Sequence, residues 1–315
     1  MNDVLYILFS AAPVLFSAMG TSLGQGRIGR QALQSMHMQP ACADAISKLS
    51  IIGMAITETA AVMGIVISIM LLSDSALIHH NDYTAMAAAG IAIAMSISGL
   101  CAGIASAAPV IAACQSMARQ PFLQTKLLNL MLIVQTLIMT PNMFGMLISL
   151  LIKAKLPYIQ TIGEALQLLA AGISIGLGCI GPSIGLSLFA FSACAAVGLN
   201  KKAFGKIMTF TFICEAIIET PAIFALLIAL MILTTTINPT SSIQGWQFIS
   251  AALCIGLSTI SPGINAGKTG AAACTQIALH LEQYPSLSKI TLLALAMIDS
   301  FAIYGLLVSI VMLLF

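Results

Sequence analysis

Three acidic residues stand where the sequence is otherwise strongly apolar. Glu219 lies inside the run Ile207–Ile237, and a helix of that length would cross a bilayer with the carboxylate near its midplane. A bare carboxylate at that depth costs roughly 3 kcal/mol or more, so it needs a chemical role. A hydroxyl residue follows each acid, in the pairs Glu58–Thr59, Glu219–Thr220 and Asp299–Ser300. A carboxyl beside a hydroxyl, away from water, can hold a proton or coordinate a small cation, and either neutralises the buried anion.

The acids recur because the sequence is a tandem repeat. The segments AITETAAVMG (55–64), TLIMTPNMFG (136–145), AIIETPAIFA (216–225) and AMIDSFAIYG (296–305) align at offsets of 81, 80 and 80 residues. The alignment gives one shared position to Glu58, Met139, Glu219 and Asp299, followed by Thr59, Thr140, Thr220 and Ser300. A methionine cannot replace a carboxylate as an ion carrier, so we interpret Met139 as a lost site. No Lys or Arg recurs at an equivalent partner position, which disfavours simple internal ion pairs.

The composition excludes a soluble domain. Of the 315 residues, 59% are hydrophobic and only 7% are charged, and the mean hydropathy is +1.05, so we expect an integral membrane protein in contact with lipids. The basic residues do not form an aromatic-laced patch, so no nucleic-acid partner is expected. The eight cysteines lie almost entirely in apolar stretches without a CxxC motif, and we interpret them as packing residues.

The elements that must position the acids are eight apolar stretches, each long enough to span a membrane. They cover about 4–36, 42–73, 84–118, 122–152, 161–197, 204–237, 246–280 and 287–315. The predicted fold is an all-α membrane protein with eight transmembrane helices in four tandem hairpins, and the repeats cover 1–81, 82–157, 158–240 and 241–315. A two-span unit preserves its orientation, so these are parallel repeats. The first helix of each pair is rich in small residues, which predicts close helix packing in an inner layer.

The distribution of basic residues predicts the orientation. An even number of spans places both termini on one side of the membrane. Most basic residues lie near the short turns of the hairpins, namely Arg30, Lys48, Arg119, Lys126, Lys201, Lys202, Lys206 and Lys289. Lys153 and Lys155 lie near a longer link and run against this bias. The positive-inside rule therefore favours cytoplasmic hairpin turns, with both termini on the opposite side.

The hairpin pattern resembles the c-subunit, or proteolipid, of rotary ATP synthases. The resemblance combines a Gly-rich first helix, a short polar turn and a second helix with a mid-membrane acid eighteen residues after the turn proline. The turn ARQP at 118–121 matches the family's loop signature, and MQP at 38–40 keeps part of it. The third and fourth turns depart from it, with LNK and LHL in the same register. The sequence is thus identified as a fused form of this proteolipid with four hairpins.

The resemblance implies a double-layered rotor ring built from copies of the chain. First helices would line the inside and second helices the outside, with a stator a-subunit and central-stalk subunits as partners. Glu58, Glu219 and Asp299 would carry ions, and ring rotation would be coupled to ATP synthesis or hydrolysis at an ATP site outside this chain. The stalk-contact loops would be Gln39–Pro40 and Arg119–Gln120–Pro121. With only three of four hairpins active, the ring would be better suited to pumping than an all-acid ring.

The resemblance leaves the transported ion open between Na⁺ and H⁺, and no tightly bound cofactor is expected. The ligands of a sodium-type site are present only in part: Gln25, Glu58, Thr59 and the Ile56 carbonyl in the first hairpin, with Tyr304 in the fourth. Thr140 or Ser300 of a neighbouring hairpin could complete that site. A proton requires only a carboxyl that can be neutralised, and the hydroxyls could instead bond a backbone carbonyl of their own helix.

Glu215 lies one helical turn before Glu219, at the position that Gln135 occupies in the second hairpin. We interpret it as a protonated hydrogen-bond partner rather than a second carrier. Two other classes of protein stay open. One is a polytopic ion channel or transporter with four parallel hairpin repeats, and the other is a structural proteolipid. Ring size and the F-type or vacuolar-type character of the complex are also left open.

Overall fold

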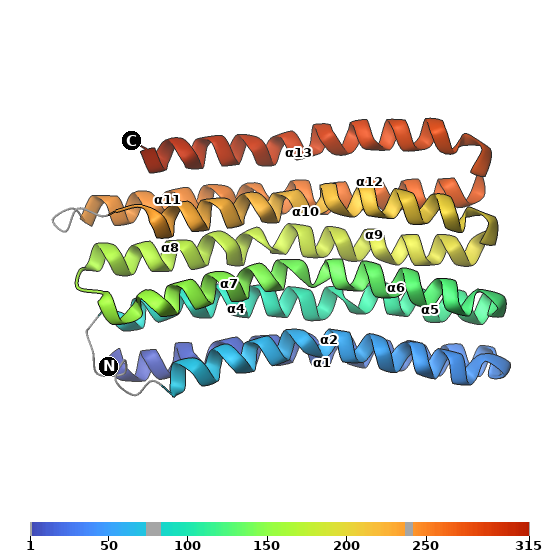
Figure 1. Cartoon of the computed structure of the whole chain (residues 1–315), viewed down its shortest axis with the longest axis horizontal. Helices are drawn as coiled ribbons and strands as arrows, with labels where there is room; N and C mark the ends of the chain where they lie inside the picture. The colour runs from blue at the N-terminus through green and yellow to red at the C-terminus, as the bar shows by residue number, and fades with distance from the viewer. Residues whose placement is uncertain (1, 74–82, 237–241, 315) are drawn as a thin grey trace.

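The computed structural model describes residues 2–73, 83–236 and 242–314, and this part of the chain folds as four helical hairpins that lie side by side in chain order (Figure 1). Hairpin 1 consists of α1 (Asn2–Met38), η1 (Pro40–Cys42) and α2 (Ala43–Leu72). Hairpin 2 consists of α4 (Thr84–Ala105), α5 (Ala107–Arg119), η2 (Pro121–Leu123), α6 (Gln124–Ile138) and α7 (Thr140–Lys155), followed by η3 (Leu156–Tyr158). Hairpin 3 consists of α8 (Ile162–Gly178), α9 (Ile180–Leu199), η4 (Lys201–Ala203) and α10 (Phe204–Thr234). Hairpin 4 consists of α11 (Ser242–Ser258), α12 (Ile260–Leu279), η5 (Leu281–Gln283) and α13 (Tyr284–Leu314).

The predicted all-α fold with eight spans is confirmed. The described residues contain eight helical segments that are long and apolar enough to cross a membrane. The hairpin turns gather at one end of the array, and the start of α1 and the end of α13 lie at the other (Figure 1). The predicted repeat boundaries at 81/82 and 240/241 lie outside the described residues, and the boundary at 157/158 falls within η3.

Prolines divide three of the four first helices. α4, α8 and α11 end at Ala105, Gly178 and Ser258, and in each case a proline follows four residues later. A proline has no N–H for the carbonyl four residues before it, and its ring crowds that carbonyl. Each helix therefore ends at the residue whose carbonyl loses its donor. The linking residues keep right-handed helical angles, so the spans stay continuous.

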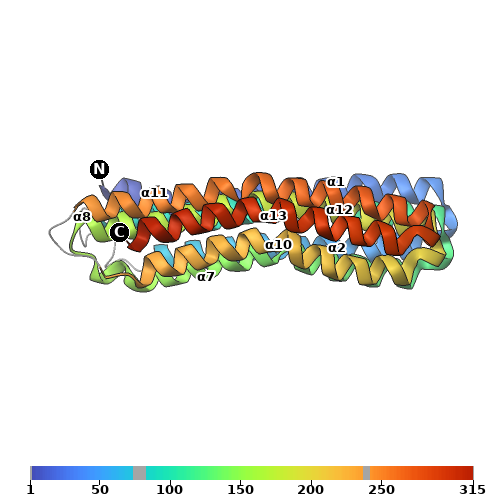
Figure 2. The same ribbon diagram turned by 90° about the horizontal axis from the view of Figure 1, so that it is seen from above.

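The helices form two layers. The first helices α1, α4–α5, α8–α9 and α11–α12 pack successively against one another, and α2, α6–α7 and α10 cover them on one side. Figure 2 shows α1, α11 and α12 along one edge of the array and α2, α7 and α10 along the opposite edge. α13 packs against α10, α11 and α12. Among the described helices none packs outside hairpin 1 or outside hairpin 4, so the array has two free ends, at α1–α2 and at α12–α13.

Glycines bring the first helices into backbone contact, as the sequence predicts. A methyl group added at Gly185 would lie 2.0 Å from the carbonyl oxygen of Gly263, and one at Gly267 would lie 2.2 Å from that of Gly185. Between hairpins 2 and 3, a methyl group at Gly172 would lie 2.0 Å from the Gly90 carbonyl oxygen. No side chain fits at these distances, so the glycines set the spacing of the inner layer.

We expect Gly185→Ala to lower the melting temperature of the detergent-solubilised chain. The added methyl group must displace the α12 backbone, and overpacking of this kind costs roughly 1–3 kcal/mol. Gly205→Ala is the matched control, because a methyl group there meets nothing within 4 Å. Thermal unfolding followed with a thiol-reactive dye would report exposure of the buried cysteines. Equal melting temperatures for the two variants would contradict the tight packing of α9 on α12.

Candidate functional site

The acids of hairpins 3 and 4 each meet a hydroxyl group of the preceding hairpin. The Thr220 hydroxyl on α10 lies 2.9 Å from Oδ2 of Asp299 on α13. Thr140 on α7 stands in the equivalent place beside Glu219 on α10. The hydroxyl residue that follows the site position of one hairpin thus lies beside the acid of the next hairpin, so each pair joins two neighbouring hairpins.

The hydroxyl group in the Thr220–Asp299 pair has a second partner. Thr220 Oγ1 lies 2.6 Å from the Ile217 carbonyl oxygen, which has no amide donor because Pro221 stands four residues later. A hydroxyl has only one proton to donate. When the Ile217 carbonyl takes that proton, the threonine oxygen can only accept from Asp299. The pair then fits a protonated carboxyl that donates to the hydroxyl, or a cation held between the two oxygens.

The same bond within a helix recurs beside Glu58 and Asp299. The Thr59 hydroxyl lies 2.7 Å from the Ile56 carbonyl oxygen, and the Ser300 hydroxyl lies 2.6 Å from the Met297 carbonyl oxygen. The alternative role for these hydroxyls, a bond to a carbonyl of their own helix, is therefore present in the structure. The Thr220 hydroxyl makes both contacts at once, one to the Ile217 carbonyl of its own helix and one to Asp299.

The side chains at the four site positions differ in how much of their surface is exposed. Glu219 is 9% exposed, and Oδ1 of Asp299 is buried without a hydrogen-bond partner in the described part of the chain. Met139 is 4% exposed and packs with Ala60 and Ala102. Glu58 is exposed, because α2 lies at the free end of the array where no preceding hairpin supplies a hydroxyl. One chain therefore places a hydroxyl residue of the preceding hairpin beside Glu219 and Asp299, and leaves Glu58 exposed.

The residues of the predicted sodium site do not come together within one chain. The Gln25 amide donates to the Met54 carbonyl at 3.2 Å, not to Glu58. The Ile56 carbonyl, an expected ligand, accepts from Thr59 instead. Tyr304 is 59% exposed, and its ring packs edge-on against Phe301 at a centroid distance of 5.9 Å. Among the described residues, no group of three or more His, Cys, Asp or Glu side chains is arranged to hold a metal ion.

The position one turn before the acid is buried in both middle hairpins. The Gln135 amide donates to the Gly53 carbonyl at 2.7 Å and to the Thr57 hydroxyl at 3.1 Å. Glu215 is fully buried, and neither carboxylate oxygen has a hydrogen-bond partner within the described ranges, so its predicted bond to Glu219 is not formed. Sequence reasoning missed Thr57, which also lies 3.1 Å from the Ser106 hydroxyl. In the sequence, only the position of Thr57 next to Glu58 could have identified it as part of the site.

An amide side chain at equivalent turn positions links hairpin 2 to hairpin 3 and hairpin 3 to hairpin 4. The Gln120 amide donates to the Gly198 carbonyl at 2.8 Å, and the repeat-equivalent Asn200 donates to the Ala278 carbonyl at 2.9 Å. Pro40 and Pro121 begin the short helices η1 and η2. A surface hollow in this region has a strongly basic lining, made by Arg119, Gln120, Pro121, Phe122, Leu199, Asn200, Lys201 and Lys202.

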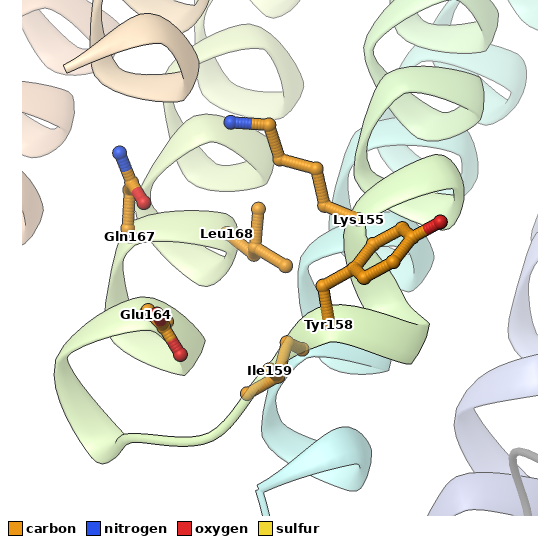
Figure 3. Close-up of a pocket in the computed structure, with 6 residues that line it drawn as sticks. All are labelled: Lys155, Tyr158, Ile159, Glu164, Gln167 and Leu168. Carbon is orange, nitrogen blue, oxygen red and sulfur yellow. The ribbon is translucent and has the colours of Figure 1, made fainter. Parts of the chain in front are cut away.

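A pocket at the opposite end has a structural role. Figure 3 shows its lining residues, which come from the end of α7, η3 and the start of α8: Lys155, Tyr158, Ile159, Glu164, Gln167 and Leu168. Lys155 donates to the Leu233 carbonyl, and Gln167 donates to the carbonyls of Ile232 and Thr235. These bonds satisfy carbonyls at the C-terminal end of α10. The pocket residues therefore anchor a helix end, and no acid of the site positions lines the pocket.

Four parallel hairpins, three of which have a carboxyl group at the same repeat position, define a membrane-embedded proteolipid built from tandem repeats. The family of ATP synthase C-subunits matches the chain four times, at residues 8–71, 89–152, 169–232 and 249–312. The chain belongs to this family, as a fused form with four hairpins.

Curated relatives match either one hairpin or most of the chain. The ATP synthase c-subunit of Dehalococcoides mccartyi is 43% identical over 70 residues, which is 22% of this chain and 92% of the relative. The ATP synthase c-subunit of Gloeobacter violaceus is 46% identical over 65 residues, which is 21% of this chain and 79% of the relative. The K-subunit of the A-type ATP synthase of Methanocaldococcus jannaschii is 28% identical over 233 residues, or 74% of this chain and 98% of the relative. One of these relatives thus aligns with most of the chain.

Proposed function

We propose that this proteolipid carries protons on Glu58, Glu219 and Asp299 as its ring turns against a stator. The Thr220–Asp299 contact carries the proposal, because it places a hydrogen-bond partner for a protonated carboxyl beside a mid-membrane acid and joins two hairpins. A protonated carboxyl at Asp299 donates to a threonine oxygen whose own proton is held by the Ile217 carbonyl. The acid can therefore travel through lipid without a net charge.

The contacts favour a proton over Na⁺. A sodium ion needs several oxygen ligands at once, as hard cations generally do. Within the described ranges, the Asp299 carboxyl meets one hydroxyl, and Gln25, the expected extra ligand, bonds a backbone carbonyl instead of Glu58. A proton needs only the carboxyl and an acceptor, and both are in place. Na⁺ stays the second candidate, with the site at Gln25, Glu58 and Thr59 completed by a neighbouring hairpin.

Release of the proton requires a polar environment at the stator. When a carboxyl reaches a hydrated half-channel, water takes its proton and the remaining carboxylate is stabilised by a cationic group of the stator a-subunit. At a second half-channel the carboxylate accepts a proton from water and returns to its hydroxyl partner. The resulting rotation would be transmitted to the central stalk through the turns, where the basic hollow around Arg119, Lys201 and Lys202 offers a surface for acidic partners. The turns would then face the cytoplasm.

Two neighbours of the site have supporting roles in this proposal. Buried Glu215, which lacks a hydrogen-bond partner among the described residues, would keep its proton throughout the cycle. Met139 would pass the stator without an ion. Each chain would thus move three protons for four hairpins, which favours pumping against a steep gradient over synthesis at a weak one.

Ion uptake by the purified complex in liposomes tests the choice of ion. We expect ATP to drive acidification of the vesicles in sodium-free buffer, and we expect no accumulation of radioactive Na⁺ when a protonophore is present. Sodium uptake that persists with the protonophore would overturn the proton assignment. Absence of both activities in a complex that hydrolyses ATP would overturn the carrier role.

Thr220→Val should slow ATP-driven transport roughly 10-fold. Valine keeps the shape of threonine but cannot accept from Asp299, and a hydrogen bond in a buried site contributes roughly 1–1.5 kcal/mol, or about tenfold in rate. Thr209→Val on the same helix is the control, because the exposed Thr209 hydroxyl bonds only the Gly205 carbonyl of its own helix, at 3.2 Å. Initial rates of acidification would compare the two variants, and equal rates would argue against a role for the Thr220 hydroxyl.

A further inference from the structure

The pocket of Figure 3 contains polar groups that its structural bonds leave unused. The Lys155 ammonium has three N–H donors, and the Leu233 carbonyl takes one of them. Glu164 accepts from two backbone N–H groups with Oε2, and no group in the described ranges donates to its Oε1. Gln167 is 5% exposed, and its amide nitrogen donates to two carbonyls at the end of α10, while no described group donates to its oxygen. The pocket therefore offers free donors from one residue and free acceptors from two others.

The pocket has one charge of each sign in its wall. Figure 3 shows Lys155 and Tyr158, from the end of α7 and from η3, on one side, and Glu164 and Gln167, from the start of α8, on the other, with Leu168 between them. The volume is about 300 Å³. Of the lining residues that the structure describes, Lys155 is the only cation and Glu164 the only anion. Because a simple anion would be repelled by Glu164 and a simple cation by Lys155, the lining is complementary to a zwitterion.

The pocket lies where the spans leave the membrane. It is at the end of the array opposite the hairpin turns, beside the ends of α7 and α10 and the start of α8 (Figure 1). Tyr158 is 77% exposed there, and tyrosines are enriched at the interface between a membrane and water. The pocket therefore stands at the level of the lipid headgroups on that side of the membrane.

An apolar groove runs from the same end of α10 toward the middle of the membrane. Its volume is about 380 Å³, and its lining consists of Ile223, Leu226, Leu227, Leu230, Met231 and Thr234. Thr234 directly follows Leu233, whose carbonyl binds Lys155 of the pocket. At 1.5 Å per residue the groove is about 16 Å long, which is close to half of a ~30 Å hydrocarbon core. The groove therefore matches the acyl chain of a lipid in one leaflet, and it ends one helical turn before the level of Glu219.

We propose that the pocket and the groove together bind one phospholipid whose headgroup carries a phosphate and a primary ammonium, as in phosphatidylethanolamine. The phosphate accepts from the Lys155 ammonium, and the lipid ammonium donates to Oε1 of Glu164 and to the Gln167 oxygen. A trimethylammonium headgroup has no N–H to donate, and a glycerol headgroup has no positive charge to meet Glu164. An acyl chain of the lipid lies in the groove on α10. This site goes beyond the proposed function and does not depend on it.

Native mass spectrometry of the purified protein, titrated with single lipids in detergent, tests the headgroup. We expect phosphatidylethanolamine to bind about tenfold more tightly than phosphatidylglycerol or phosphatidylcholine of the same chain length. Glycerophosphoethanolamine, which has the same headgroup without acyl chains, should leave the bound lipid in place at equal concentration. Equal affinities for the three lipids would overturn the headgroup assignment, and displacement by the soluble compound would overturn the assignment to a lipid.

Two neutral variants separate lipid recognition from the structural role of the pocket. Glu164→Gln keeps an acceptor for the start of α8, because glutamate and glutamine both serve at this position of a capping box. We expect it to lose the preference for phosphatidylethanolamine over phosphatidylglycerol. Lys155→Gln can still donate to the Leu233 carbonyl, but it should bind both lipids about tenfold more weakly.

Lys153→Gln is the matched control, because Lys153 lies two residues from Lys155 on α7 and does not line the pocket. Its lipid affinities should equal those of the unchanged chain. The melting temperature of each variant would verify its fold. Unchanged lipid affinities in folded Glu164→Gln and Lys155→Gln would overturn the site.

Discussion

We expect Glu219→Gln to slow ATP-driven proton transport by the assembled complex about 100-fold, and Asp299→Asn to slow it much less. The difference follows from the order of carriers along the array. In the proposed mechanism Met139 carries no ion, so the largest gap between carriers is already two hairpins. Loss of Glu219 widens it to three, from Glu58 to Asp299. Loss of Asp299 leaves two gaps of two hairpins, since Glu58 of the next chain follows.

The size of the effect comes from the stator charge. For one additional hairpin step, the stator cation has no carboxylate to meet, and an unpaired charge in the bilayer costs roughly 3 kcal/mol, which corresponds to about 100-fold in rate. Rates of vesicle acidification at equal ATPase content would measure it. Glu282→Gln, on an exposed residue of η5, is the control. Equal loss in the Glu219 and Asp299 variants would contradict the spacing argument.

Met139→Glu should raise the number of protons per ATP by one third. The change raises the number of carriers per chain from three to four. By the repeat, Thr59 of hairpin 1 stands to position 139 as Thr140 of hairpin 2 stands to Glu219, so the new carboxyl would also have a hydroxyl residue beside it. Because more protons then accompany each ATP, synthesis should begin at a weaker proton-motive force, and hydrolysis should sustain a smaller gradient. The proton-motive force at which ATP synthesis begins in liposomes, measured at a fixed phosphorylation potential, gives the number of protons per ATP.

Met139→Gln separates charge from size in this experiment. Glutamine is as large and polar as the new acid but cannot exchange a proton. The proton-motive force at which ATP synthesis begins should therefore be the same for Met139→Gln as for the unchanged chain. An unchanged threshold in a correctly assembled Met139→Glu ring would show that hairpin 2 is silent for a reason other than its missing carboxyl.

The repeat made the fold and the level of the acids predictable from sequence. Apolar run lengths predicted eight spans, and the offsets of 81, 80 and 80 residues placed Glu58, Met139, Glu219 and Asp299 at one position. Glycine spacing predicted the close inner layer, since only glycine allows the backbone of α9 at Gly185 to touch that of α12.

Pairings between hairpins could not be predicted. Periodicity places a residue on its helix but gives no information on which neighbour it meets, so the contact of Thr220 with Asp299 needed the structure. Gln25 was expected beside Glu58, but its amide reaches the Met54 carbonyl, a backbone partner that spacing alone does not reveal. Gly26 and Gly29 looked like Gly20 and Gly24 in the sequence, yet only the latter pair packs within the chain.

Covalent labelling of the intact ring with dicyclohexylcarbodiimide tests the central claim most directly. The reagent reacts with protonated carboxyl groups in apolar surroundings, and peptide mass spectrometry locates each adduct. We predict adducts at Glu58, Glu219 and Asp299, parallel loss of ATP-driven transport, and none at exposed Glu282. Full inhibition of transport with all three of these acids unmodified would contradict their role as carriers.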